Sequence, residues 1–207
     1  TDRLISNEIS EVKLHLNADI AYQEKSARFL ENHDEQRAIV SLGTQRSLAA
    51  AVLISTIPGM KLYFDGQFEG KKIRLPVQLG REPIEKPTQL VVDFYNKLLP
   101  IINSRIFTEG EFYKLEIDPA AEGNNSYEDM FAFLWKLESE MWIVVINYSD
   151  SASQCRIIFD PETDKAKITL TDHLTGDKYI RKVEEIKNAG LYIELKCYRG
   201  HIFSIEK

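Results

Sequence analysis

Cysteine and histidine are scarce in this chain of 207 residues, which contains two cysteines and four histidines. Cys155 and Cys197 lie far apart, so their spacing fits neither a disulfide framework nor a metal-binding motif. Each lies in an apolar, strand-like run, which predicts two buried free thiols. His33 has carboxylates beside it but no second histidine nearby. The sequence therefore predicts no metal site, and we expect no cofactor.

Positive charge and long apolar runs are also limited. The 26 Lys and Arg residues are outnumbered by 32 Asp and Glu residues, which gives a net charge of -6. This balance argues against nucleic acid or an anionic membrane as a partner. No apolar run is long enough to span a bilayer, and no signal peptide is visible after Thr1. We therefore expect a cytoplasmic location.

The composition of the chain changes near residues 106–111. With 43% hydrophobic residues, the chain can form one or two hydrophobic cores. Residues 1–107 are rich in helical patterns, whereas residues 108–207 are rich in strand patterns. The sequence therefore predicts two domains with these boundaries.

The first region alternates strands and helices. Strands are predicted at 27–30 and 60–64, and helices at 7–16, 18–24, 44–57 and from residue 88 onward. Thr44 is a plausible N-cap, and Pro100 is expected to break or kink the last helix. The order strand-helix-strand-helix requires parallel pairing of the two strands. Two parallel strands cannot cover both faces, so this region is either the end of a larger α/β domain or recruits a partner.

The second region consists of short β-branched and aromatic runs separated by turn-forming residues. This pattern is typical of an antiparallel sandwich. The link at 138–140 predicts a hairpin. The predicted strands are 111–117, 130–137, 141–148, 154–159, 165–170, 178–183, 191–195 and 201–205.

The densest group of ionisable residues follows the first predicted strand, at 29–37. A loop just beyond a strand end can turn both His33 and Asp34 toward one pocket. A carboxylate and a neutral imidazole there can hydrogen-bond the hydroxyl groups of a sugar. Two structural alternatives remain open: the pair caps the strand end, and Glu31, Glu35 and Arg37 form an ion-pair network.

Other chemistries fit the sequence poorly. The segment 66–72 resembles a phosphate-binding loop, but its spacing is one residue short, and Lys72 stands where Ser or Thr should bind magnesium. No nucleophile elbow accompanies Ser41 or Ser47. Trp135 and Trp142 follow a core-like alternation.

The segment 29–37 resembles the last signature motif of the alpha-amylase family of glycoside hydrolases, which contains Asn-His-Asp. The segment 58–67 is similar to the strand that follows in that family, and the helix around 94–99 is similar to its last barrel helix. The β-rich remainder resembles the sandwich that usually comes next. The resemblance covers nearly the whole chain in the same order.

The resemblance implies an α/β plus all-β fold: the last two β-α units of an incomplete (β/α)8 or TIM barrel, followed by an antiparallel β-sandwich. Asp34 would be the carboxylate that stabilises the transition state. His33, Asn32 and Arg37 would bind substrate. The intact parent would act on an α-glucan or maltooligosaccharide in carbohydrate metabolism.

The family retains anomeric configuration, which requires a nucleophile and an acid/base in addition to Asp34. Residues 1–28 contain no Gly-any-Arg-any-Asp segment, so both groups are missing from this chain. We therefore expect the chain alone to be inactive and to self-associate through its uncovered sheet. The rival hypothesis is a non-catalytic module that binds carbohydrate or a protein.

Overall fold

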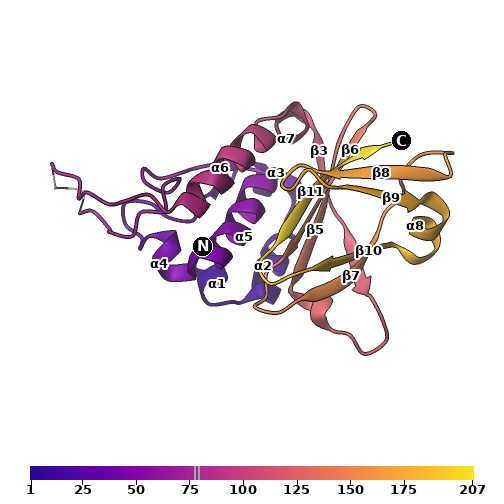
Figure 1. Ribbon diagram of the computed structural model, residues 1–207, viewed down its shortest axis with the longest axis horizontal. Helices are drawn as coiled ribbons and strands as arrows, with labels where there is room; N and C mark the ends of the chain where they lie inside the picture. Colours follow the sequence, from indigo (N-terminus) through magenta and orange to yellow (C-terminus); the bar gives the residue numbers. More distant parts are fainter. Residues whose placement is uncertain (77, 79) are drawn as a thin grey trace. The chain divides into compact units, whose positions relative to one another are not determined.

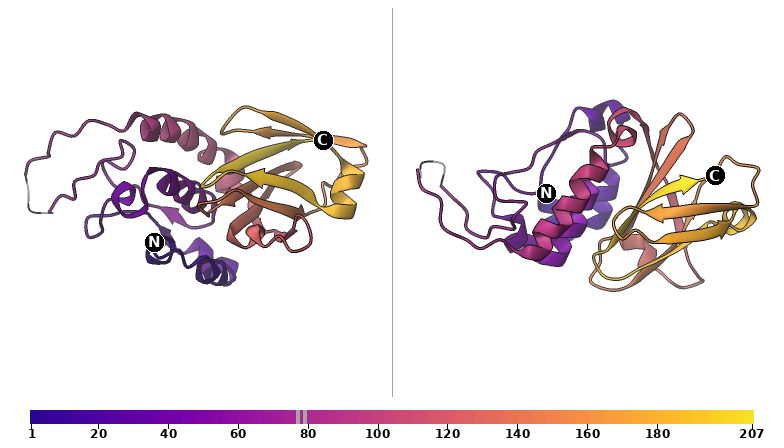
Figure 2. Two further views of the ribbon diagram at one scale, coloured as in Figure 1. Left: turned by 60° about the horizontal axis from the view of Figure 1, so that its bottom comes forward. Right: turned by 45° about the horizontal axis from the view of Figure 1, so that its top comes forward.

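The computed structural model describes residues 1–76, 78 and 80–207. The chain divides into two compact units, Thr1–Pro100 and Ile101–Lys207. The first unit is mainly helical and the second is mainly β, as the sequence predicts (Figures 1 and 2). The division lies a few residues before the boundary expected at residue 107 and falls inside the last helix of the first unit.

The first unit combines short helices with two very short strands. Its elements are α1 (Asp2–Ile5), α2 (Ile9–His15), α3 (Ile20–Glu24), β1 (Ala27–Arg28), α4 (Ala38–Leu42), α5 (Thr44–Thr56), β2 (Met60–Lys61) and α6 (Gln89–Ile102). The predicted helices and strands are present, although both strands are shorter than expected. The helices α1 and α4 were not anticipated, because four or five residues are too few to show helical periodicity.

The two strands of the first unit pair in parallel. Ala27 is opposite Met60 and Arg28 is opposite Lys61, with α4 and α5 in the connection between the strands. The segment from Ser47 to Thr56 of α5 is buried throughout. A helix that is apolar all round belongs to a protein interior, and the small side chains of Ala49, Ala50 and Ala51 allow close packing. The predicted parallel pairing with a helical crossover is confirmed.

The ends of α5 differ from the expectation at one point. The N-cap is Gly43, with φ of 74° and no side-chain cap, and not Thr44, which is already helical. At the other end, Lys61 Nζ donates to the carbonyl oxygen of Gly59 at 2.7 Å, and Arg28 Nε donates to that of Pro58 at 3.1 Å. These cations from both strands satisfy carbonyl groups just beyond the helix C-terminus. The helix α6 is not broken at Pro100 but continues to Ile102.

The second unit contains two antiparallel sheets. Its helical elements are α7 (Arg105–Glu109), a 3-10 turn at Ser126–Asp129 and α8 (Val183–Ala189). The six-stranded sheet has the order β3-β5-β6-β11-β8-β9, and the three-stranded sheet has the order β10-β7-β4. The strands are β3 (Glu111–Lys114), β4 (Glu116–Pro119), β5 (Met130–Leu137), β6 (Glu140–Asn147), β7 (Ser153–Ile158), β8 (Lys167–Asp172), β9 (Lys178–Lys182), β10 (Leu191–Leu195) and β11 (Gly200–Glu206).

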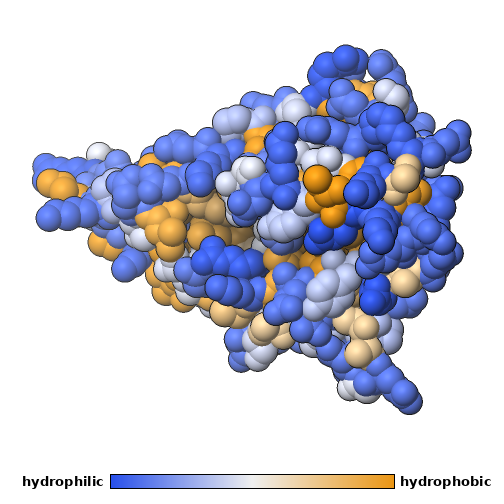
Figure 3. Space-filling model, turned by 45° about the vertical axis from the view of Figure 1, so that its right-hand side comes forward, coloured by the Kyte–Doolittle hydropathy of each residue, from blue (hydrophilic) through white to orange (hydrophobic). Residues whose placement is uncertain are grey.

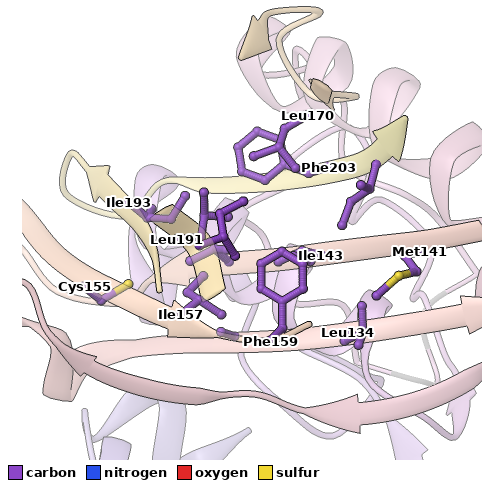
Figure 4. Packing of buried hydrophobic residues seen from close by; sticks show 14 of the residues in the cluster. Leu134, Met141, Ile143, Cys155, Ile157, Phe159, Leu170, Leu191, Ile193 and Phe203 are labelled. Carbon is purple, nitrogen blue, oxygen red and sulfur yellow. The ribbon is translucent and has the colours of Figure 1, made fainter. Parts of the chain in front are cut away.

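One hydrophobic core draws side chains from both sheets. Leu134, Ile143 and Phe203 of the larger sheet belong to the same buried cluster as Ile157 and Ile193 of the smaller sheet (Figure 4). The helix α8 adds Val183 and Ile186 to this cluster. Alternate residues along β5 and β6 supply this core, because successive side chains of a strand point to opposite faces, and the residues between them are mostly buried as well.

Two expectations for the β region are corrected. The single strand expected at 111–117 is two strands: β3 pairs with β5 in the larger sheet, whereas β4 pairs with β7 in the smaller one. Cys155 is buried as predicted, but Cys197 is exposed, and these two cysteines form no disulfide. Cys197 lies outside the strands, next to Tyr198, whose φ is 50°. The predicted hairpin is confirmed, because Leu137 of β5 is paired with Glu140 of β6.

The face of the molecule drawn in Figure 3 is mostly hydrophilic, and its hydrophobic surface gathers in a few contiguous areas. None of the helices in the described part of the chain combines the length and apolar character that a membrane span requires.

Candidate functional site

The candidate site is the turn that follows β1 in the first unit. β1 and β2 run in parallel, so their carboxyl ends lie at the same edge of the sheet. Leu30 continues from β1 and is 1% exposed, which anchors the chain just before the turn. The polar residues from Glu31 to Arg37 follow Leu30 directly, and the first of them, Glu31, is still buried.

Asn32 shapes the turn with its own side chain. Its Oδ1 atom accepts hydrogen bonds from the backbone N–H groups of Asp34, at 2.8 Å, and Glu35, at 3.0 Å. An asparagine that hydrogen-bonds the backbone two and three residues later closes a local turn. This turn places His33 and Asp34 at its tip, with Asn32 itself half-buried below them.

His33 and Asp34 lie side by side and face solvent. His33 Nε2 is 3.2 Å from Asp34 Oδ2, and their side chains are 60% and 75% exposed, respectively. A carboxylate provides several acceptor sites, and an imidazole provides a donor or an acceptor at each nitrogen. The pair can therefore hydrogen-bond a ligand that carries several hydroxyl groups. The sequence predicted that both side chains turn toward one pocket; the structure places them side by side at an exposed turn, and their binding roles stay a prediction.

Arg37 does not share this exposure. It forms an ion pair with Glu31 at 2.7 Å, and both side chains are only 2% exposed. The predicted ion-pair network is thus confirmed for these two residues. A direct contact between Arg37 and a sugar would require an exposed guanidinium group. The burial of Arg37 therefore favours a structural role, in which it holds the segments around the turn in place.

The Glu31–Arg37 pair joins three segments of the first unit. Arg37 donates to the carbonyl oxygens of Asp65, at 2.7 Å, and Ile73, at 3.1 Å, in the loop after β2. Glu31 Oε2 accepts the backbone N–H of Ala38, the first residue of α4, at 2.5 Å. The residues between Glu31 and Arg37 are therefore held at both ends by one buried pair.

Burial affects the protonation of Glu31. Desolvation raises the pKa of its carboxyl group, and the hydrogen bonds from Ala38 and Arg37 act in the opposite direction. The guanidinium of Arg37 also lies over the ring of Phe64, 5.0 Å from its centroid. A charge pair so enclosed is costly to disrupt, because either partner alone would be an uncompensated buried charge.

The sequence did not reveal the part played by the loop after β2. Carbonyl groups of Asp65 and Ile73 complete the coordination of Arg37, and backbone groups leave no signal in the residue pattern. Gly66 and Gly70, considered above as parts of a phosphate loop, instead belong to a turn in which Gln67 is buried and donates to Tyr95 Oη at 2.7 Å. No cluster of metal-ligating side chains occurs in the described ranges of the chain.

Comparison with known proteins gives matches in structure only. No family model matches the chain, and a search of curated proteins found no match. A maltogenic alpha-amylase from Thermotoga neapolitana superimposes with a TM-score of 0.66 at 20% identity, over 87% of this chain and 41% of the other. An alpha-amylase from Geobacillus thermoleovorans, complexed with acarbose, gives a TM-score of 0.68 at 16% identity, over 89% of this chain and 39% of the other.

A debranching enzyme from Nostoc punctiforme is also similar, with a TM-score of 0.60 at 22% identity, over 96% of this chain and 37% of that enzyme. The chain thus spans less than half the length of the solved structures that it matches. Identities this low establish likeness of fold. The resemblance predicted from the sequence is confirmed at that level: the chain has the fold of the C-terminal portion of alpha-amylase family structures.

Proposed function

We propose that the chain is the C-terminal part of an alpha-amylase-like glycoside hydrolase or transglycosidase that acts on α-glucosidic bonds. The observation that carries the proposal is the pair of exposed, adjacent side chains of His33 and Asp34 at the end of a parallel strand. The match of most of the chain to alpha-amylase structures supports it. The substrate of the intact protein would be an α-glucan or maltooligosaccharide.

In this proposal, β1 and β2 with their helices are the last two β-α units of a (β/α)8 barrel. The nine strands of the second unit form an antiparallel β-sandwich after the barrel. The parallel register of β1 and β2 and the shared core of the two antiparallel sheets support these assignments.

Asp34 would hold hydroxyl groups of the sugar at the cleavage point and stabilise its positively charged transition state. A carboxylate suits both tasks, because it accepts several hydrogen bonds and carries negative charge. His33 would hydrogen-bond the same sugar, and Asn32 would fix the turn. Arg37 would support the turn through Glu31 and would not touch the substrate.

Hydrolysis with retention needs a nucleophile and an acid/base that this chain is not expected to supply. The test compares two proteins: the chain of residues 1–207, and the longer protein proposed to contain it. We expect the longer protein to cleave or transfer an aryl α-maltooligosaccharide and the chain alone to leave it intact. Turnover by the chain alone, or a longer protein without action on any α-glucan, would reject the proposal.

A second candidate function, a carbohydrate-binding module, is favoured by the outer face of the three-stranded sheet. Tyr192 Oη donates to Glu194 at 3.0 Å, and Gln154 Nε2 donates to the same carboxylate at 3.3 Å. The guanidinium of Arg156 lies 5.8 Å from the centre of the Tyr192 ring. An aromatic ring among polar side chains suits a sugar. Affinity of the chain for soluble starch that Tyr192→Ala removes and Asp34→Asn leaves intact would support this function.

A further inference from the structure

A surface hollow of about 410 Å³ lies in the second unit beside the edge strand β9. It is lined by Lys167, Ile180, Arg181, Lys182, Glu185 and Tyr192. Three cationic residues and one acidic residue thus line the hollow, in a chain with a net charge of -6. The hollow lies in a different unit from His33 and Asp34, and the inference below does not rest on the proposed function.

Two of these cations are neighbours on adjacent strands, on the same face of the sheet. Lys167 of β8 is directly opposite Lys182 of β9 in the antiparallel register, so their side chains share a face of the sheet. Like charges in directly opposed positions destabilise a sheet. Nearby lysines are paired with acids: Lys178 lies 3.8 Å from Glu206, and Lys187 lies 3.5 Å from Asp160. Within residues 1–76, 78 and 80–207, no ion pair involves Lys167 or Lys182.

Protection of a sheet edge accounts for only part of this arrangement. Lysine on an edge strand prevents pairing with other chains, which explains Lys182 on β9. Lys167 is the first residue of β8 and lies outside the segment Thr169–Asp172 that pairs with β11, so edge protection does not by itself explain why a lysine on each strand is opposed here. An anion between the two lysines would turn their mutual repulsion into attraction to a shared ligand.

Arg181 also lines the hollow, but it precedes Lys182 in β9, so its side chain points to the opposite face of the sheet from the two lysines. Its Nη1 donates to the carbonyl oxygen of Ile180 at 3.0 Å, and its guanidinium lies 5.5 Å from the centre of the Tyr179 ring. These contacts hold the guanidinium on the Tyr179 side of β9, so the two lysines are the cations that face the same side of the sheet. Ile180, which is 64% exposed, and Tyr192 provide apolar surface next to the cations.

We propose that this hollow binds a phosphate group, either free or as the ester of a small sugar. Lys167 and Lys182 would neutralise its charge and donate hydrogen bonds to its oxygens. The volume is within the range of sites for small organic ligands, and the apolar surface of Tyr192 and Ile180 would lie against the sugar of an ester.

The test titrates the chain with inorganic phosphate and, separately, with glucose 6-phosphate, and follows backbone amide signals by NMR at constant ionic strength. We expect saturable shifts at β8, β9 and Tyr192 that sodium chloride does not produce. The variant Lys167→Gln/Lys182→Gln should bind phosphate at least about tenfold more weakly, since it loses two charge-assisted contacts. Lys97→Gln, which removes an exposed lysine of α6, should bind normally.

Thermal unfolding separates loss of the site from loss of the fold. Without phosphate, the double variant should melt at the same temperature as the parent chain or higher, because a like-charge pair is removed. Phosphate should raise the melting temperature of the parent and not that of the double variant. If the double variant fails to fold, the single variant Lys167→Gln provides the same comparison. If glucose 6-phosphate binds more tightly than inorganic phosphate, the ligand is a phosphate ester. If the two bind equally, the ligand is free phosphate. No saturable response, or an equal loss in Lys97→Gln, overturns the proposal.

Discussion

A side chain on Gly66 would collide with the guanidinium of Arg37: a Cβ atom built there lies 2.9 Å from Arg37 Nη2 and 2.5 Å from Lys71 Cδ. Gly66 also has φ of 86°, a conformation that other residues adopt at a cost. The loop after β2 thus approaches the buried Arg37 closely because it has a glycine at this position. The relationship ties the geometry of this loop to the ion pair behind the His33–Asp34 turn.

We therefore predict that Gly66→Ala destabilises the chain by about 2–3 kcal/mol, since it adds steric overlap to backbone strain. Gly123→Ala is the matched control, because Gly123 has φ of 76° and no atom within 4 Å of its Cβ position. It should cost only about 1 kcal/mol. The measurement is the free energy of unfolding in urea. If Gly66→Ala and Gly123→Ala lower it equally, the close approach of Gly66 to Arg37 does not affect stability.

Glu31→Gln should be more damaging than a surface substitution. It leaves the guanidinium of Arg37 without the charge of its partner, and breaking a buried pair costs about 3–5 kcal/mol. The comparison variant is Glu109→Gln, which breaks the Arg105–Glu109 pair, whose side chains are 67% and 52% exposed. That change should leave the stability nearly unaltered, because an exposed ion pair is screened by solvent. The measurement is denaturant unfolding of both variants. If Glu109→Gln loses more stability than Glu31→Gln, Glu31 does not have the structural role assigned to it.

Lys61 gives a prediction for pH. Burial, together with the nearby charge of Arg28, lowers the pKa of Lys61 from 10.5 to about 8. Between these values the unfolded chain binds more protons at this residue than the folded chain, so the contribution of Lys61 to stability rises with pH. The full shift corresponds to about 3 kcal/mol.

The measurement compares the parent chain with Lys61→Met between pH 7 and 10.5, because other titrations cancel in the difference. We expect the stability of the parent relative to the variant to increase through this range, by at most about 3 kcal/mol. A difference independent of pH would mean that Lys61 keeps its ordinary pKa in the folded chain.

In the longer protein, Asp34→Asn should lower kcat/KM for maltooligosaccharides by about 10²–10³-fold, as expected when a group that stabilises transition-state charge is lost. His33→Gln should have a smaller effect, about tenfold, because it removes a neutral hydrogen-bonding group. Both side chains are exposed, so melting temperatures should change little. Normal activity in Asp34→Asn would exclude the proposed role of this residue.

Self-association of the isolated chain is predicted from the two-stranded sheet. Met60 is 62% exposed and Leu62 is 38% exposed, on or beside β2. Light scattering should show concentration-dependent oligomers that Met60→Asp/Leu62→Asp reduces, because these changes place charge on an apolar surface. Ile180→Asp, at a residue that is 64% exposed in the other unit, is the control and should not dissociate them. A chain that is monomeric at every concentration tested would contradict this expectation.

The sequence by itself determined the elements with strong local patterns. The strands β5 and β10 have the predicted bounds, because alternation and turn residues act over a few positions. The parallel pairing of β1 and β2 followed from a helix between two short strands. The position of His33 and Asp34 just beyond a strand end was also readable, since a buried run stops there.

Only the tertiary structure decided which partners these segments find. The run 111–117 enters two different sheets, because its pairing depends on β5 and β7, which are distant in sequence. Arg37 looked like a residue for binding, but its partners include the carbonyl groups of Asp65 and Ile73, and it is buried. Local periodicity reports what a segment can form, whereas burial and long-range hydrogen bonds depend on contacts that form only when the whole unit folds.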